Sequence, residues 1–134
     1  NFLGNDVSGA NLIANTEKHY PGGTVTGPTN VSFTNGNFQT FTIGSNTLTL
    51  TFTDWPTANK VGKIRLMLLD TLGDSTARTV SFATENGTIK YGVNGDNPFP
   101  SPFIVNSNDD PVCVDVWTYD GGITVYAQYV GQFS

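Results

Sequence analysis

A strict alternation of polar and apolar residues decides the fold of this chain, and it is clearest in TLTLTFT at residues 47–53. Leu48, Leu50 and Phe52 fall on one side of an extended chain, and the four threonines fall on the other. Successive side chains of a strand point to opposite faces. The segment therefore predicts a half-buried strand whose threonine side faces water or a partner.

The segments on either side of this strand predict further strands. Residues 38–43 precede it, and Gly44-Ser45-Asn46 between them is typical of a short turn, so the pair is expected to form a β-hairpin. Residues 61–70 form an almost continuous apolar run. That run indicates a central strand covered on both faces.

The same period continues to the C-terminus. Residues 78–83 and 88–91 indicate strands, and three valines alternate with Cys113, Asp115 and Trp117 in the segment after them. A second alternating run at residues 123–130 follows Asp120-Gly121-Gly122, and Asp-Gly between two such runs is a strong hairpin signal. The chain is therefore expected to be all-β, an antiparallel β-sandwich or jelly roll.

The N-terminal segment has a different pattern. Residues 1–29 show neither strand nor helix periodicity, and Pro21-Gly22-Gly23 and Gly27-Pro28 interrupt them. They are expected to form an extended N-terminal arm, and residues 30–134 are expected to form the β-sandwich domain. A start at Asn1, without methionine, indicates a trimmed or processed chain.

Composition excludes several classes of function. The 134 residues suit a single domain, and only 13% of them are charged, about half the ~25% usual for globular proteins. A net charge of −5 and a pI near 4.4 argue against nucleic-acid binding. No segment approaches the ~20 apolar residues of a membrane helix, and one cysteine excludes an internal disulfide.

Catalytic chemistry finds little support in the sequence. His19 lies in the arm and is interpreted as a surface residue, and Cys113 lies inside a strand and is interpreted as a buried one. Aspartates are available for glycoside hydrolysis, but their spacing does not pair them. We therefore expect no enzyme activity, catalytic residue, metal site or cofactor. A weaker alternative is calcium at the turn formed by Asn106, Asn108, Asp109 and Asp110.

Asp115 is unlike the other aspartates because it lies in the middle of a strand between valines. An unpaired carboxylate there would be costly unless its face of the sheet is wet. The sequence predicts a structural ion pair, with Arg78 as the first candidate and Lys63 and Arg65 as alternatives.

Aromatic residues among asparagine, aspartate and threonine have two interpretations. Their rings could pack in the core or between subunits, which is the favoured reading, or they could stack against sugars. The residues expected to contact a glycan or a partner are Trp55, Tyr91, Trp117 and Tyr119, with Tyr126 and Tyr129 as further surface aromatics.

A succession of segments resembles the small β-sandwich domains of tailed-phage virion proteins, found in head-decoration and head-fibre proteins and at the ends of tail fibres. The resemblance covers residues 38–133. It rests on the alternating strand and Trp-Pro turn at 47–56, the run from Gly62 to Asp70, Gly73 with Arg78-Thr79-Val80, Ile89-Lys90-Tyr91, and the closing segment at 114–122 with Phe133. Ser81-Phe82-Ala83 stands where the family often has a Trp-Pro pair, and the turn at residues 72–77 is longer.

The resemblance implies a non-enzymatic homotrimer on the surface of a phage virion. Capsid decoration, as a cement or head-fibre protein, is favoured because the chain is short and has its own arm. Residues 1–29 would then contact the major capsid protein or another virion protein. The alternative is a tail-fibre receptor-binding or carbohydrate-binding module that recognises a host-surface glycan.

Overall fold

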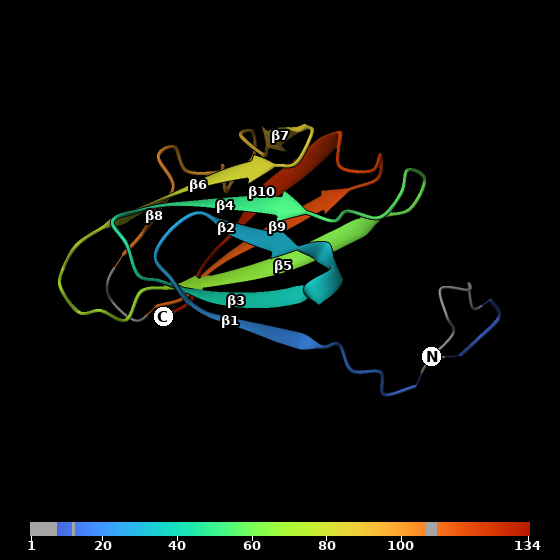
Figure 1. Ribbon diagram of the computed structural model, residues 1–134, viewed down its shortest axis with the longest axis horizontal. Helices are drawn as coiled ribbons and strands as arrows, with labels where there is room; N and C mark the ends of the chain where they lie inside the picture. The colour runs from blue at the N-terminus through green and yellow to red at the C-terminus, as the bar shows by residue number, and fades with distance from the viewer. Residues whose placement is uncertain (1–7, 12, 107–109) are drawn as a thin grey trace.

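The computed structural model describes residues 8–11, 13–106 and 110–134, which form two β-sheets packed against each other (Figure 1). The only helix in this described part is η1 (Phe33–Asn35), a single 3-10 turn, and no helix there is suited to crossing a membrane. The strands are β1 (His19–Val25), β2 (Thr29–Ser32), β3 (Phe38–Ile43), β4 (Thr47–Thr53), β5 (Gly62–Leu69), β6 (Arg78–Thr84), β7 (Thr88–Tyr91), β8 (Ile104–Val105), β9 (Val112–Thr118) and β10 (Thr124–Gln132).

The two layers enclose one apolar core. One sheet has the strand order β1-β3-β5-β9-β10-β7, and the other has the order β2-β4-β6-β8. Both contribute fully buried side chains, such as Ile43, Leu66 and Val114 from the larger sheet and Leu50 and Phe52 from the smaller one. The prediction of an all-β sandwich is confirmed.

The path of the chain between the layers differs from the prediction. Every connection between successive described strands crosses from one sheet to the other, except the last, from β9 to β10. Neighbours within each sheet are therefore often two strands apart in sequence, and five of the eight pairings, β1–β3, β3–β5, β2–β4, β4–β6 and β7–β10, are parallel. The sandwich is mixed rather than purely antiparallel.

The hairpin predicted from residues 38–43 and 47–53 is wrong. β3 and β4 lie in different sheets, and Gly44-Ser45-Asn46 carries the chain from one layer to the other. Phe41 of β3 and Leu50 of β4 both point into the core, from opposite sides. A hairpin and a crossing between layers bury the same alternate residues, so the sequence period could not distinguish them.

The alternation itself is confirmed. In β4 the apolar side chains are buried, and the threonines from Thr47 to Thr51 lie on the outer face, although Thr53 at the end is also buried. β5 is central, between β3 and β9, as predicted. Only its inner face is fully covered, because Lys63 and Arg65 on the outer face are exposed.

The closing hairpin is confirmed as well. β9 and β10 pair in antiparallel fashion around the turn at residues 119–123. The Asp120 carboxylate accepts hydrogen bonds from the Thr118 hydroxyl at 2.9 Å and from the Thr124 backbone N–H at 2.9 Å. Gly122 has a φ of +89°, and a Cβ there would lie 2.5 Å from Cδ1 of Trp55, so the turn requires glycine at this position.

The sandwich begins earlier than residue 30. His19–Val25 forms β1, an edge strand of the six-stranded sheet that runs parallel to β3, and β2 begins at Thr29. The described residues of 8–18 are exposed and lead away from the sheets toward the N-terminus (Figure 1). Among the described residues of the predicted arm, 8–11, 13–18 and the connection at 26–28 lie outside the strands, and residues 1–7 and 12 fall outside the described part of the chain.

Candidate functional site

The outer face of the six-stranded sheet carries a row of four side chains that crosses four strands. Strand register places Lys63 of β5 opposite Trp117 of β9, Trp117 opposite Tyr126 of β10, and Tyr126 opposite Lys90 of β7. Directly opposed residues share a face, so two aromatic rings lie between two lysines. Neither lysine has a carboxylate within ion-pair distance in the part of the chain that the structure describes.

A third ring extends this row past the end of β9. The rings of Tyr119 and Tyr126 lie nearly parallel, with centroids 5.8 Å apart, and those of Trp117 and Tyr126 lie 6.0 Å apart at 21°. Tyr119 is 56% exposed. Its hydroxyl lies 3.3 Å from that of Tyr126, and this hydrogen bond raises the pKa of the Tyr126 phenol. We call Trp117, Tyr126 and Tyr119 the aromatic row.

The next row along the strands holds the ion pair of Asp115, and its partner is Arg65 rather than Arg78. Arg65 lies directly opposite Asp115, and its Nε and Nη2 each donate to a different carboxylate oxygen at 2.8 Å. These contacts raise the pKa of Arg65. Gln128 of β10 is opposite Asp115 on the other side, so this row presents a guanidinium, a carboxylate and an amide.

Arg78 was the wrong partner because it belongs to the other sheet. It lies in β6, 3% exposed, where its Nε donates to Asp70 at 2.8 Å and its Nη2 to Asp74 at 2.6 Å. It also hydrogen-bonds Asn46. Asp70 is fully buried and accepts from the Leu72 backbone N–H as well. Arg78 therefore holds the turn after β5 against the turn before β4, which is a structural role.

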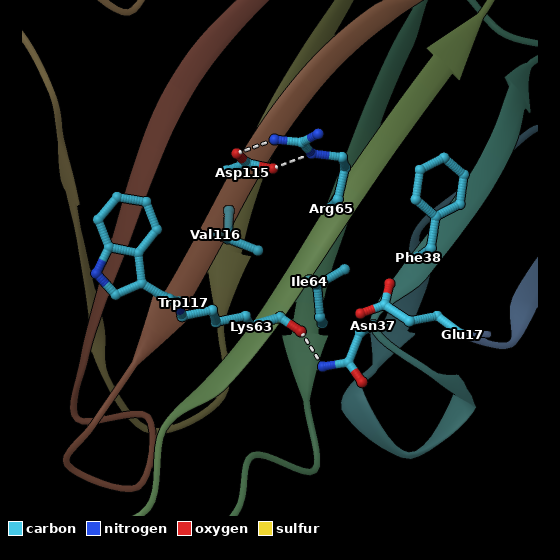
Figure 2. A pocket seen from close by; sticks show the side chains of 9 residues that line it. All are labelled: Glu17, Asn37, Phe38, Lys63, Ile64, Arg65, Asp115, Val116 and Trp117. Atoms are coloured by element: carbon cyan, nitrogen blue, oxygen red, sulfur yellow. Dashed lines mark hydrogen bonds and ion pairs between the residues drawn. The ribbon is translucent and has the colours of Figure 1, made fainter. Parts of the chain in front are cut away.

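Two hollows meet at the aromatic row. The larger one, about 610 Å³, lies over β3, β5 and β9, and Figure 2 shows Trp117 beside Lys63, with Glu17 and Asn37 on the far side. The smaller one, about 310 Å³, lies on the side of β10 and β7. Its lining residues are Lys90, Tyr91, Gly92, Asn94, Asn97, Trp117, Tyr126, Ala127 and Gln128. Trp117 lines both, so we treat the two hollows as one surface, the outer groove.

The other aromatic candidates have different positions. Trp55 packs on Phe33 and Phe52, and its Nε1 donates to the Thr84 hydroxyl at 3.3 Å, so it covers one end of the core. Tyr91 lines the groove at its β7 side, but its ring packs on Phe99 with centroids 4.8 Å apart. Burial raises the pKa of the Tyr91 phenol. The structure thus brings Trp117 and Tyr119 together on either side of Tyr126, whereas Trp55 packs against the core.

The outer face of the four-stranded sheet is chemically different, because none of the outward residues of its strands is charged. A carboxylate lies at its edge, where Asp54 accepts a hydrogen bond from the Ser32 hydroxyl at 2.5 Å. Its outward residues form cross-strand rows, in which Thr49 is opposite Ser81 and Thr47 is opposite Thr79. The outward members are Asn30, Ser32, Thr47, Thr49, Thr51, Thr79, Ser81, Ala83 and Ile104. We call this surface the neutral face.

Residues considered for catalysis or metal binding do not converge in the described chain. His19 is exposed and hydrogen-bonds the Thr40 hydroxyl at 2.8 Å. Cys113 is buried as predicted, and burial raises the pKa of its thiol. No group of three or more potential metal ligands occurs among the described residues. The possible calcium turn includes residues 107–109, which lie outside them.

The fold and its surfaces define a β-sandwich module with one neutral face and one aromatic groove. No protein-family model, curated protein or solved structure matches this chain.

Trp117 of the groove and Tyr119 beside it were identified from the sequence, but the other polar residues that line the groove were not. Lys63, Lys90 and Gln128 come from three strands and become neighbours only through the pairing of β5, β9, β10 and β7. Their signal in the sequence was an outward position in an alternating strand. That signal shows a face but not which strands adjoin.

Proposed function

We propose that the protein is a non-enzymatic structural module displayed on the surface of a phage virion, where it assembles as a homotrimer and decorates the capsid. The observation that supports this proposal most is the neutral face. Surfaces of threonine and serine can approach one another without desolvating ions, which is costly at an interface. The resemblance of residues 38–133 to virion β-sandwich domains supports the same function.

The neutral face has the properties of a contact between copies of the chain. Thr47, Thr49 and Ser81 are short, uncharged and placed in register on neighbouring strands. Because such side chains are short and carry no charge, the face of one copy can pack on that of another without desolvating an ion. The ionised side chains of the opposite face would stay in water when three copies meet through their neutral faces.

A charge placed on the neutral face tests this assembly. The double variant Thr49→Lys and Ser81→Lys puts two like charges at directly opposed positions, which repel each other and their copies in a trimer. Sedimentation velocity at micromolar concentration should give a trimer of the 14.4 kDa chain for the wild type and a monomer for the variant.

Thr88→Lys is the matched control, because Thr88 is an exposed strand residue of the other sheet. It should remain trimeric. A wild-type protein that sediments as a monomer, or a double variant that stays trimeric, would overturn the proposed interface.

The second candidate is a glycan-binding or receptor-binding module, and one observation favours it. Aromatic rings offer sugars a flat apolar surface, and in the outer groove they lie beside amide, guanidinium and carboxylate groups that can bond hydroxyls. A glycan array is the direct test. This function and the trimer are compatible, because they use opposite faces of the sandwich.

A further inference from the structure

We propose that the outer groove binds a linear, uncharged chain of pyranose sugars that lies across the strands from β3 to β7. The inference rests on the second candidate function and specifies its site and ligand class. It is carried by the register that aligns Lys63, Trp117, Tyr126 and Lys90, and by the second row of Arg65, Asp115 and Gln128 beside it.

The dimensions of the groove favour a chain over a single sugar. Strands β3, β5, β9, β10 and β7 are neighbours in that order, and four spacings of about 4.8 Å give a path of about 19 Å. Trp117 lies near the middle of this path, where it lines both hollows. A ligand that occupies both would pass over the indole, so one sugar ring would stack there.

The polar groups are placed to bond hydroxyls on either side of that ring. Arg65 and Asp115 hold each other through two hydrogen bonds, which fixes both without help from a ligand. Asn97 at the β7 side donates to the backbone oxygens of Tyr129 and Val130, and Asn37 at the β3 side donates to that of Lys63. Groups that are already ordered lose little entropy on binding.

The charge of the groove favours an uncharged ligand. Its lining contains three basic residues, Lys63, Arg65 and Lys90, and two acidic ones, Glu17 and Asp115. The near balance gives no strong attraction for a polyanion, and the chain as a whole carries −5. The two lysines then act as hydrogen-bond donors at opposite ends of the aromatic pair.

Tryptophan fluorescence can report binding at this site, because the chain has two tryptophans and only Trp117 lines the groove. The probes are linear hexasaccharides of glucose, galactose and mannose, a uronate hexasaccharide and a thymidine dodecanucleotide. In a Trp55→Phe background, titration with a neutral hexasaccharide should change the emission. The Kd should be nearly the same at 0.05 M and 0.5 M NaCl, because no ions are exchanged.

Calorimetry of variants then locates the site. Trp117→Ala should weaken binding by about tenfold or more, since it removes the stacking surface. Phe133→Ala is the matched control, because Phe133 is an exposed aromatic residue outside the groove. It should bind as the wild type does.

Each other outcome overturns the inference. Binding of the uronate or the oligonucleotide alone, with a steep salt dependence, would show that the ligand is a polyanion. A glycan that binds Trp117→Ala and the wild type equally would leave glycan binding intact but place it elsewhere. No binding of any probe would contradict the groove as a glycan site, and sedimentation of the same samples would still report on the trimer.

Discussion

Asp70 and Asp115 both pair with an arginine, but the two pairs differ in burial. Asp70 and Arg78 are 0% and 3% exposed, whereas Asp115 and Arg65 are 28% and 51% exposed. Asp70→Ala leaves a buried guanidinium without its main partner, so we expect it to lower the free energy of unfolding by about 3–5 kcal/mol. Asp115→Ala should cost about 0–1 kcal/mol, because water screens that pair.

Urea denaturation followed by circular dichroism measures both variants. Equal losses for Asp70→Ala and Asp115→Ala would contradict the structural role assigned to the buried pair. The sequence predicted that Asp115 is paired, because a mid-strand carboxylate needs a partner. It could not choose among Lys63, Arg65 and Arg78, since that choice depends on which strand adjoins β9 and on the register in which the two strands pair.

Asp120 gives the closing hairpin a dependence on pH. The Thr124 backbone N–H and the Thr118 hydroxyl donate to its carboxylate, and they lower its pKa below the ordinary 3.8. The ionised Asp120 carboxylate therefore stabilises the folded state. This contribution is fully present above about pH 3.8 and is lost as the pH falls through the lower pKa that Asp120 has in the folded state. Urea midpoints between pH 5 and pH 2 should therefore fall more steeply for the wild type than for Asp120→Asn.

Asp96→Asn controls for the loss of one negative charge, because Asp96 is an exposed residue of the loop at 92–103. Its midpoints should follow those of the wild type. If Asp120→Asn does the same, the carboxylate does not hold the turn.

At the scale of elements, the presence of β1 means that deletions of residues 1–18 and of residues 1–25 should have different effects. The sequence alone predicted one continuous arm there, and so predicted no difference. Removal of residues 1–18 leaves β1 paired with β3, so the sandwich should keep its thermal midpoint, while attachment to capsids should be lost if this segment makes the contact. Removal of residues 1–25 also deletes the edge strand, exposes β3 and Phe41, and should lower the midpoint by several degrees.

Thermal melts and co-sedimentation with particles measure the two effects. Continued attachment of the 1–18 deletion would show that the arm is not the anchor, and an unchanged midpoint for the 1–25 deletion would show that β1 adds little stability. The sequence missed β1 because its seven residues include Pro21, Gly22 and Gly23, which mask any alternation. The β9–β10 hairpin was predictable because both its alternating strands and its Asp-Gly turn are local.

For the whole molecule, the crossings between layers affect the rate of folding. β1 pairs with β3, β2 with β4 and β7 with β10, and in each case at least one other strand lies between the two in sequence. Most pairings therefore bring together residues that are far apart along the chain. All-β domains dominated by such pairings refold in about milliseconds to seconds. Stopped-flow fluorescence after dilution from urea should give a time in this range, and refolding within microseconds would contradict the topology.

The sequence predicted that the fold is an all-β sandwich, but it did not predict the order and direction of the strands in the two sheets. A period of two fixes which side chains are buried, and the turns fix where strands end. Neither the period nor the turns show which of the two sheets a strand joins. An apolar side chain such as Phe41 or Leu50 is buried in the core equally well from either sheet. The residues of the groove could not be predicted for the same reason, because they come together only when particular strands become neighbours in the sheet.

The crossings also bear on how the module resists force. Eight of the nine connections between described strands tie one sheet covalently to the other. A pull that tends to separate the layers is therefore shared by the backbone at many points, in addition to the apolar core. A partner held on the neutral face of the smaller sheet and a ligand held in the outer groove of the larger sheet would pull the sandwich in this direction. The path of the chain suits it to act as a mechanical coupling between two bodies.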